Sequence, residues 1–343
     1  MEIINPLGLR GWDDLVSSHP AGSFFHTSSW ARVLVESYGY RPTYFSIREN
    51  GTLRALLPMM EIDSFLTGRR GVALPFSDYA DPFAVDEAQY RVLAENVVQY
   101  GKKATWKTVE IRGGGYPWAE EVNSSDFLGH RLSLSGTETE IQAGFRTNMR
   151  QNISRALKEG VQIEMSNSSD AVEAYYRLHC ITRKSHGIPP QPLKFFRKIQ
   201  EYILQKNMGS IILATFRNTV VAGIVLFHHG TKAIYKYGAS SEAGKQSRAN
   251  NLVMWEGIKW YKQQGFKEFC FGRTETGNVG LRDYKLGYGA SEYLLPYYKF
   301  DLSKNSIVEK RVEGISSFLE RCYQKVPIPM SRIVGSILYR HIG

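Results

Sequence analysis

Three cationic residues follow a short strand-like segment in a glycine-rich stretch at residues 265–290. Residues 269–272 are predicted to form the strand, and the loop after it carries Arg273, Arg282 and Lys285. Cations placed together suit an anionic group or an oxyanion that develops during a reaction, and glycines let backbone approach a ligand closely. The glycine spacing fits neither a P-loop nor a dinucleotide-binding fingerprint. The alternative is a surface loop whose charges are solvated.

A second polar group lies earlier in the chain, at Arg146, Asn148 and Arg150. The pattern of residues 139–159 predicts a helix, in which Arg146 and Arg150 are one turn apart and share a face. Such a pair suits a phosphate or an RNA backbone. A solvated helix face is the alternative.

Lys184, His186 and Tyr237 are further candidates. Lys184 and His186 lie at the end of a predicted helix at residues 170–187, and Tyr237 lies near the end of a predicted strand. Regular alternation places Tyr237 on the same face as Tyr235, so the pattern does not separate a pocket wall from a core residue. The histidine spacing is not that of a metal site, and motifs of zinc proteases and serine hydrolases are absent from the sequence. No bound metal is expected.

The composition indicates a packed globular protein with an anionic partner. The chain has 343 residues, enough for two domains, and its net charge of +10 favours phosphate, nucleic acid or an anionic membrane. Its 3 cysteines lie far apart, which favours reduced thiols over a disulfide framework. Neither a signal core nor an apolar run long enough for a transmembrane helix is found, so we expect a cytoplasmic protein.

The elements that must position these residues occur twice in the same order. The first copy has predicted strands at residues 44–47, 54–62 and 71–75, a helix at 87–103 and a strand at 108–112, and the first two strands flank the hairpin signal Asn50-Gly51. The second has strands at 210–216, 220–228 and 233–238, a helix at 250–264 and the strand at 269–272. This repeat predicts two similar mixed α/β domains with a cleft between them.

The predicted boundaries are a first domain at residues 1–138, a second at 139–302 and a helical tail at 303–343 that Pro327 and Pro329 interrupt. The tail has two interpretations. It packs back on the first domain, or it forms an amphipathic cationic helix that rests on an anionic membrane.

Five segments together resemble the FemABX-like family of peptidyl and aminoacyl transferases, which are built from two GNAT folds. The segments are residues 24–30 (FFHTSSW), 146–161 (RTNMRQNISRALKEGV), 184–196 (KSHGIPPQPLKFF), 237–241 (YGASS) and 271–289 (FGRTETGNVGLRDYKLGYG). The resemblance spans about residues 20–300, and the order of the segments carries it. A double GNAT fold would also give the internal repeat.

The resemblance implies transfer of an acyl group, typically an amino acid, to an amine of a cell-envelope precursor. Lys285 matches the family's lysine and is expected to be catalytic as the partner of the oxyanion. The implied substrate-binding residues are Arg146, Asn148, Arg150, Lys184, His186, Tyr237, Arg273 and Tyr284. No tightly bound cofactor is implied, because the acyl donor is a co-substrate.

Two departures from the family leave the donor open. Some members carry a long helical hairpin associated with tRNA, for which residues 186–209 leave no room. Acetyl-CoA-dependent GNAT enzymes have a glycine-rich diphosphate loop, which residues 242–250 do not match. Aminoacyl-tRNA, acyl-carrier protein and acyl-CoA therefore all stay open as donors. The acceptor that the resemblance implies is a peptidoglycan or exopolysaccharide precursor, and a lipid-linked precursor is one of the alternatives.

A competing hypothesis is a non-catalytic module that binds RNA or another polyanion. The net charge of +10 and the cluster of Arg146, Arg150 and Arg155 favour it. Such a module would bind RNA with a steep salt dependence, whether or not Lys285 is present.

Overall fold

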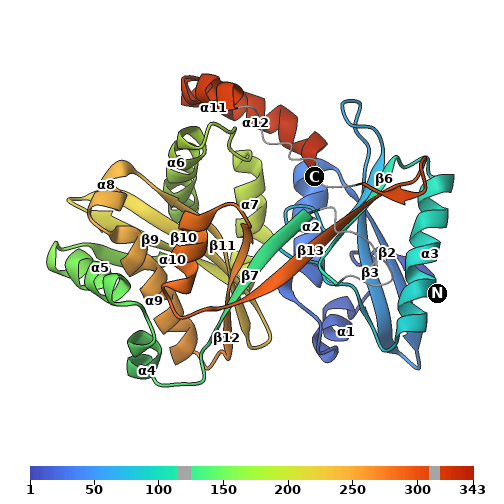
Figure 1. Ribbon diagram of the computed structural model, residues 1–343, viewed down its shortest axis with the longest axis horizontal. Coiled ribbons are helices and arrows are strands. Elements are labelled where there is room, and N and C mark those ends of the chain that lie inside the picture. Colours follow the sequence, from blue (N-terminus) through green and yellow to red (C-terminus); the bar gives the residue numbers. More distant parts are fainter. Residues whose placement is uncertain (115–124, 309–316) are drawn as a thin grey trace. The chain divides into compact units, whose positions relative to one another are not determined.

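The computed structural model describes residues 1–114, 125–308 and 317–343. By internal contacts the chain divides into two units (Figure 1). Unit 1 comprises Met1–Leu128, Leu294–Glu313 and Ile337–Gly343, and unit 2 comprises Gly129–Tyr293 and Gly314–Ser336. These limits differ from the expected boundaries at residues 138 and 302, because two long strands that the sequence analysis did not predict begin in one unit and end in the other.

Unit 1 begins with a strand and two helices and continues into the first copy of the repeat. Its elements are β1 (Glu2–Ile4), α1 (Trp12–Ser18), the 3₁₀ helix η1 (Phe24–His26), α2 (Ser28–Tyr38), β2 (Arg41–Glu49), β3 (Thr52–Ile62), β4 (Arg70–Ala73), β5 (Phe83–Ala84), α3 (Glu87–Lys103) and β6 (Thr108–Arg112). β2, β3 and β4 are antiparallel neighbours, and β6 pairs with β4 in parallel after the α3 crossover. The β2–β3 turn uses Asn50 and Gly51, both at positive φ, as the hairpin signal requires.

Unit 2 holds the second copy. Its elements are β7 (Ser125–Ser133, which begins in unit 1), α4 (Glu138–Ala143), α5 (Thr147–Lys158), β8 (Gln162–Ser166), α6 (Ser169–Ser185), α7 (Leu193–Tyr202), the 3₁₀ helix η2 (Leu204–Lys206), β9 (Gly209–Phe216), β10 (Thr219–His229), β11 (Lys232–Ser240), α8 (Glu242–Gln246), α9 (Ala249–Gln263), β12 (Glu268–Glu275) and α10 (Val279–Leu286). The chain then forms β13 (Ser291–Asp301, which ends in unit 1), β14 (Ser306–Ile307), α11 (Ser317–Gln324) and α12 (Ile328–Ile342).

The topology of unit 2 repeats that of unit 1. β9, β10 and β11 are antiparallel neighbours, and β12 pairs with β11 in parallel after the α9 crossover. Alternate residues of β10 face opposite sides. Ile224 and Leu226 join the core cluster that includes residues of α5 and α9, whereas a side chain at Gly223 would meet Tyr175 of α6. Each unit therefore has the strand and helix order of a GNAT fold, which confirms the predicted repeat.

Two predicted elements were wrong in detail. The single helix expected at residues 139–159 is two helices, α4 and α5, which are separated by a turn at Gly144. The glycine-rich loop expected after residue 272 is instead the end of β12 followed by α10. This helix forms despite Gly277 and Gly280 because Asn278 caps it, accepting from the backbone N–H of Leu281 at 3.1 Å.

Candidate functional site

The parallel strands β11 and β12 pair only at their first residues. The register runs from Lys232 opposite Glu268 to Ile234 opposite Cys270, and no further pair is found in the part of the chain that the structure describes. Both strands nevertheless continue, to Ser240 and Glu275 respectively. Because buried backbone groups need hydrogen-bond partners, the unpaired strand ends must find them elsewhere. We call the unpaired parts of β11 and β12 the open strand end.

Lys285 of α10 supplies partners to the β12 side of the open strand end. Its side chain is buried, with 1% exposed, and Nζ donates to the carbonyl oxygens of Gly272 at 3.1 Å and Arg273 at 2.9 Å. Successive carbonyls of a regular strand point in opposite directions, so two neighbours reach one ammonium only where the strand is irregular. Gly272 provides this irregularity with a φ of +69°. The arrangement keeps a positive charge buried at the open strand end.

A polar cluster lies beside Lys285. Arg282, one turn before it on α10, makes two hydrogen bonds to the carboxylate of Glu292, at 2.7 and 2.8 Å. Nε2 of His130, on β7, lies 3.2 Å from Oε2 of the same carboxylate. The hydrogen bond from Arg282 lowers the pKa of Glu292. The ionised carboxylate thus links a strand residue to the helix that carries Lys285.

His130 is neutral in this cluster. Its side chain is fully buried, and burial together with the positive charge of Lys285 lowers its pKa. An ionised carboxylate only accepts hydrogen bonds, so Nε2 must carry the proton and Nδ1 must present a lone pair. Among the described residues Nδ1 has no hydrogen-bond partner, and neither does the buried Oγ1 of Thr274 on β12. Buried polar atoms without partners mark places for a water molecule or a substrate group.

Tyr237 does not share a face with Tyr235, contrary to the regular alternation expected from the sequence. Leu226 of β10 pairs with Tyr235 and Val225 pairs with Tyr237, so Lys236 is an extra residue in β11. A bulge of this kind shifts the alternation by one residue. Tyr235 accordingly packs against the core cluster that contains Leu226, and Tyr237 faces the opposite side of the sheet.

The Tyr237 ring packs among aromatic residues of α6 and α7. Its centroid lies 6.1 Å from that of Phe195, 5.7 Å from that of Phe196 and 6.4 Å from that of His179. Burial, followed by the charge of Arg183, lowers the pKa of His179 well below its ordinary value, so this imidazole is neutral within the aromatic cluster. Tyr237 is therefore a wall of the aromatic cluster beneath β11.

Lys184 and His186 lie at the C-terminal end of α6. Hydrogen bonds join this end of the helix to β11 at the open strand end. Thr182 Oγ1 donates to the carbonyl of Ser240 at 3.1 Å and accepts from its N–H at 2.9 Å. Burial, followed by the charges of Arg183 and Lys245, lowers the pKa of His186. The backbone contact places the end of α6 against the last residue of β11.

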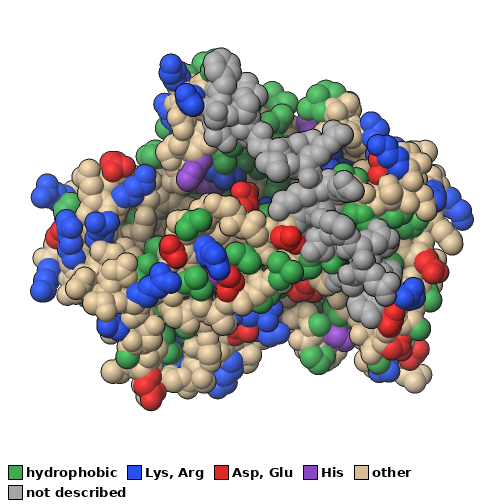
Figure 2. Space-filling view, in the orientation of Figure 1, with side chains coloured by type: hydrophobic (Ala, Val, Ile, Leu, Met, Phe, Trp, Pro, Cys, Tyr) green, Lys and Arg blue, Asp and Glu red, His purple; other side chains and the backbone are tan. Residues whose placement is uncertain are grey.

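Arg146 and Arg150 do not form the expected clamp in this structure. Arg146 precedes the first turn of α5 as its N-cap, and its guanidinium lies 3.6 Å from the carboxylate of Asp283. The Arg150 guanidinium donates to the carbonyls of Ala143 and Phe145, both at 2.7 Å, which closes the turn between α4 and α5. Lys and Arg side chains also gather on the surface in the area of α5 (Figure 2).

The remaining candidates fall into two environments. Arg273 lies on the open strand end, where its carbonyl binds Lys285. Tyr284 points from α10 to α9, because its hydroxyl donates to the carbonyl of Asn250 at 3.1 Å, and burial raises its pKa well above the ordinary value. Asn148 is exposed in the first turn of α5. The structure thus brings Arg273 and Lys285 together, while Tyr284 anchors their helix to α9.

The segment between β11 and α9 offers no evident cradle for a diphosphate. Residues 242–246 form the short helix α8, and the N–H groups of Lys245, Ser247 and Arg248 donate to carbonyls within the same segment. A methyl group at Gly244 would lie 2.2 Å from the carbonyl oxygen of Val221, so α8 packs directly on β10. Amides used in this way are not available to a phosphate.

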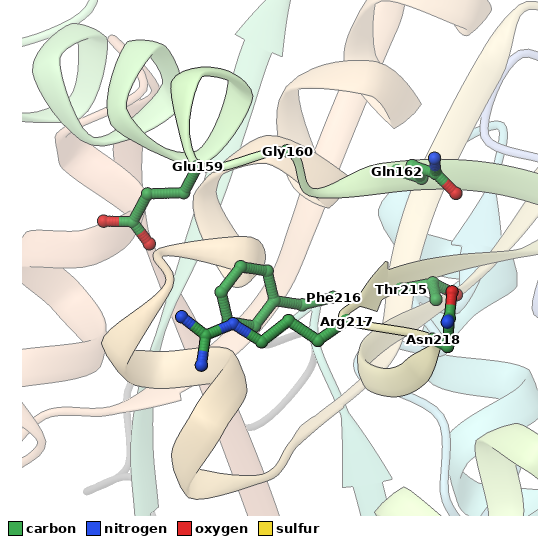
Figure 3. A pocket seen from close by; sticks show the side chains of 7 residues that line it. All are labelled: Glu159, Gly160, Gln162, Thr215, Phe216, Arg217 and Asn218. Carbon is green, nitrogen blue, oxygen red and sulfur yellow. The ribbon is translucent and has the colours of Figure 1, made fainter.

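A cavity of about 630 Å³ lies elsewhere, at the edge of unit 2 (Figure 3). It is lined by the end of α5, by β8 and by the β9–β10 turn, where the Arg217 guanidinium carbon lies 4.9 Å from the centroid of the Phe216 ring. None of the candidate residues lines it. The cavity opens between surface residues of an edge strand, and we assign it no part in the chemistry.

His130 and Glu292 were missed by the sequence analysis. They lie 162 positions apart and meet because β7 and β13 are neighbours in the strand order. Neither strand was predicted, so the sequence offered no signal for the pair. Arg282 was recognised as a cation of the stretch, but its partner was not.

The family model for the acetyltransferase (GNAT) domain matches residues 143–293, which include every candidate residue. A lipid II:glycine glycyltransferase of Staphylococcus epidermidis is 20% identical over 402 positions that cover 92% of this chain and 96% of the relative. A UDP-N-acetylmuramoylpentapeptide-lysine N(6)-alanyltransferase of Weissella viridescens is 23% identical over 132 positions, 38% of this chain and 39% of the relative.

Among solved structures, FemX gives a TM-score of 0.68 at 14% identity, covering 86% of this chain and 97% of FemX. A tandem GNAT protein from the clavulanic acid biosynthesis pathway gives 0.59 at 8% identity, covering 88% and 97%. The repeated topology, the matched GNAT domain and these relatives support the resemblance of this chain to the FemABX-like family of double GNAT-fold N-acyltransferases.

Proposed function

We propose that this protein transfers an aminoacyl group from an activated ester to an amine of a peptidoglycan precursor. The observation that carries the proposal is the buried ammonium of Lys285, which lies at the open strand end inside the matched domain. A fixed positive charge of this kind stabilises negative charge that develops on a carbonyl oxygen. We further propose that the acceptor is linked to lipid and that the protein works at the inner face of the membrane.

In the proposed reaction the lone pair of the neutral acceptor amine attacks the carbonyl carbon of the donor ester. A C–N bond forms, and the carbonyl oxygen becomes an oxyanion that Lys285 stabilises electrostatically. The intermediate collapses with cleavage of the C–O bond, and the alcohol leaving group takes up the proton that the amine nitrogen loses. No net oxidation or reduction occurs, so no redox cofactor is required.

The names of the relatives support this class of substrate. One transfers glycyl groups with lipid II as its named substrate, and the other transfers alanine to the N(6) amine of a lysine in a precursor peptide. Both names describe formation of an amide from an aminoacyl group and an amine. An enzyme of this class also fits better than the polyanion-binding module, because Arg150, one of the residues invoked for that module, binds its own backbone.

The donor is a separate part of the proposal. The use of α8 amides within their own segment argues against acetyl-CoA as the donor. Between α6 and β9 the chain forms only α7 and η2, so this segment contains no long helical hairpin. The alignment with the glycyltransferase extends over 402 positions although this chain has 343 residues, so that relative carries segments without a counterpart here. We propose an aminoacyl ester as donor, bound without such a hairpin.

Mass spectrometry of the acceptor tests the proposal. The purified protein is incubated with charged tRNA, acyl-CoA or acyl-carrier protein, each with lipid II, with a soluble precursor peptide or with an amino-sugar exopolysaccharide precursor. The expected result is a new amide on a peptidoglycan precursor with an aminoacyl donor. Transfer from acyl-CoA alone, or to the exopolysaccharide precursor alone, would contradict the proposal, as would no transfer with any pair.

A further inference from the structure

α12 exposes a stripe of large apolar residues. Met330, Ile333, Val334 and Ile337 recur with the spacing of one helix face, and between 39% and 62% of each side chain is exposed. α12 is one of the helices coloured red at the C-terminal end of the chain (Figure 1). Soluble surfaces carry single exposed apolar residues, whereas a contiguous apolar stripe marks an interaction site.

The other side of α12 is packed and fixed. A methyl group at Gly335 would lie 2.0 Å from the carbonyl oxygen of Pro190, and Tyr339 is buried with its carbonyl accepting from the hydroxyl of Tyr40 at 2.9 Å. Arg70 donates to the carbonyls of His341 and Ile342 at the C-terminal end of the helix. The opposite face of α12 is therefore already packed and hydrogen-bonded, and the apolar residues face outward.

We call Met330, Ile333, Val334 and Ile337, which share one face of the continuous helix α12, the apolar stripe.

α12 and the turn before it carry cations and no acidic residue, although Glu320 lies in the preceding helix α11. The cations are Lys325, Arg332 and Arg340, and all three are exposed. The guanidinium carbon of Arg332 lies 5.2 Å from the centroid of the Tyr176 ring of α6, so this residue points away from the apolar stripe. An apolar helix face accompanied by Lys325 and Arg340 suits the interface of an anionic bilayer. Within the described ranges no helix is long and apolar enough to span a bilayer.

We propose that the apolar stripe docks the protein on an anionic lipid bilayer, with α12 parallel to the surface. The apolar side chains enter the boundary between headgroups and acyl chains, and Lys325 and Arg340 approach the lipid phosphates. This inference deepens the proposed function, because a lipid-linked acceptor would be met at the same surface. Binding to lipid requires neither donor nor acceptor, so the two proposals can fail separately.

Co-flotation with vesicles tests the inference. The full chain is mixed with vesicles of phosphatidylcholine, with or without phosphatidylglycerol, at low and high salt. The wild type is expected to bind the anionic vesicles and to lose binding as salt rises. Ile333→Ser/Ile337→Ser should lower the partition coefficient about tenfold or more, because two inserted side chains are removed. Leu157→Ser, at an exposed apolar position on the cationic helix α5, is the matched control and should change binding less than about twofold.

Several outcomes would overturn the inference. They are no binding of the wild type at low salt, equal loss in the Leu157→Ser control, or loss only when the two isoleucines are replaced by glutamate and not by serine. A wild-type dimer in analytical ultracentrifugation that the double serine variant dissociates would assign the stripe to a second copy instead. Vesicle binding without aminoacyl transfer to either lipid II or a soluble precursor peptide would remove the proposed function and leave this surface in place.

Discussion

Replacing Lys285 by methionine should destabilise unit 2 strongly, although the substitution keeps the length and apolar stem of the side chain. Two hydrogen bonds are lost, at 3.1 and 2.9 Å to the carbonyls of Gly272 and Arg273. Each bond from a charged donor contributes about 1.5–3 kcal/mol, and a carbonyl left buried without a partner costs about 1–3 kcal/mol. The desolvation of the ammonium, which is no longer required, offsets part of this loss. We expect the free energy of unfolding to fall by about 2–4 kcal/mol.

The matched control is Lys262→Met. Lys262 also donates to a backbone carbonyl, that of Leu134 at 2.9 Å, but this lysine makes one such bond and is only partly buried. Water can replace it, so the expected loss is about 0.5–1.5 kcal/mol. Urea unfolding followed by circular dichroism compares the two variants, which lie in the same unit. If Lys285→Met loses no more stability than Lys262→Met, the structural argument for a buried, doubly bonded ammonium is refuted.

Three further predictions each concern the surroundings of one residue. As the pH falls from about 7 to about 5, the free energy of unfolding should decrease, because burial lowers the pKa of His179 and only the unfolded chain takes up its proton near 6.5. Urea titrations should show a shallower decrease for His179→Gln than for the wild type. A rise in stability over this pH range would contradict the account. Gly238→Ala should lower the free energy of unfolding by about 1–3 kcal/mol, because a methyl group there would lie 1.8 Å from the hydroxyl of Tyr235. A double-mutant cycle with Tyr235→Phe should recover part of this lost stability, and strict additivity of the two substitutions would refute the contact. Thr274→Val should change stability by less than about 1 kcal/mol, because its buried hydroxyl has no partner among the described residues, yet should slow aminoacyl transfer; an unchanged transfer rate would remove Thr274 from the site.

The local elements of the fold could be predicted from the sequence. α3 and β6 have the predicted limits, because an amphipathic pattern capped by Asp86 and a short buried strand are both signals of nearby residues. The turn residues Asn50 and Gly51 predicted their hairpin for the same reason. α10 was missed because Gly280 within it and Gly277 just before it weaken the helix signal. The contact of buried Lys285 with β12 is a tertiary contact that no local pattern contains.

The site could be predicted only in part. The order of the motifs identified Lys285 and Arg273, which the structure brings together. The bulge at Lys236 was not visible, because one extra residue in a strand has no composition of its own, and it reversed the face assigned to Tyr237. His130 and Glu292 depend on the neighbouring strands β7 and β13, which are distant in the sequence. The cleft expected between the two domains stays a prediction.

The rate of aminoacyl transfer by Lys285→Met tests the central claim most directly. Once a donor and acceptor are identified, the kcat of this variant is compared with those of the wild type and Lys262→Met at saturating substrates, at a temperature where all three are folded. Loss of the charge that stabilises the oxyanion should lower kcat about 10²–10³-fold, while Lys262→Met stays near the wild type. A kcat for Lys285→Met within about threefold of the wild-type value would contradict the assignment of Lys285 as the catalytic cation.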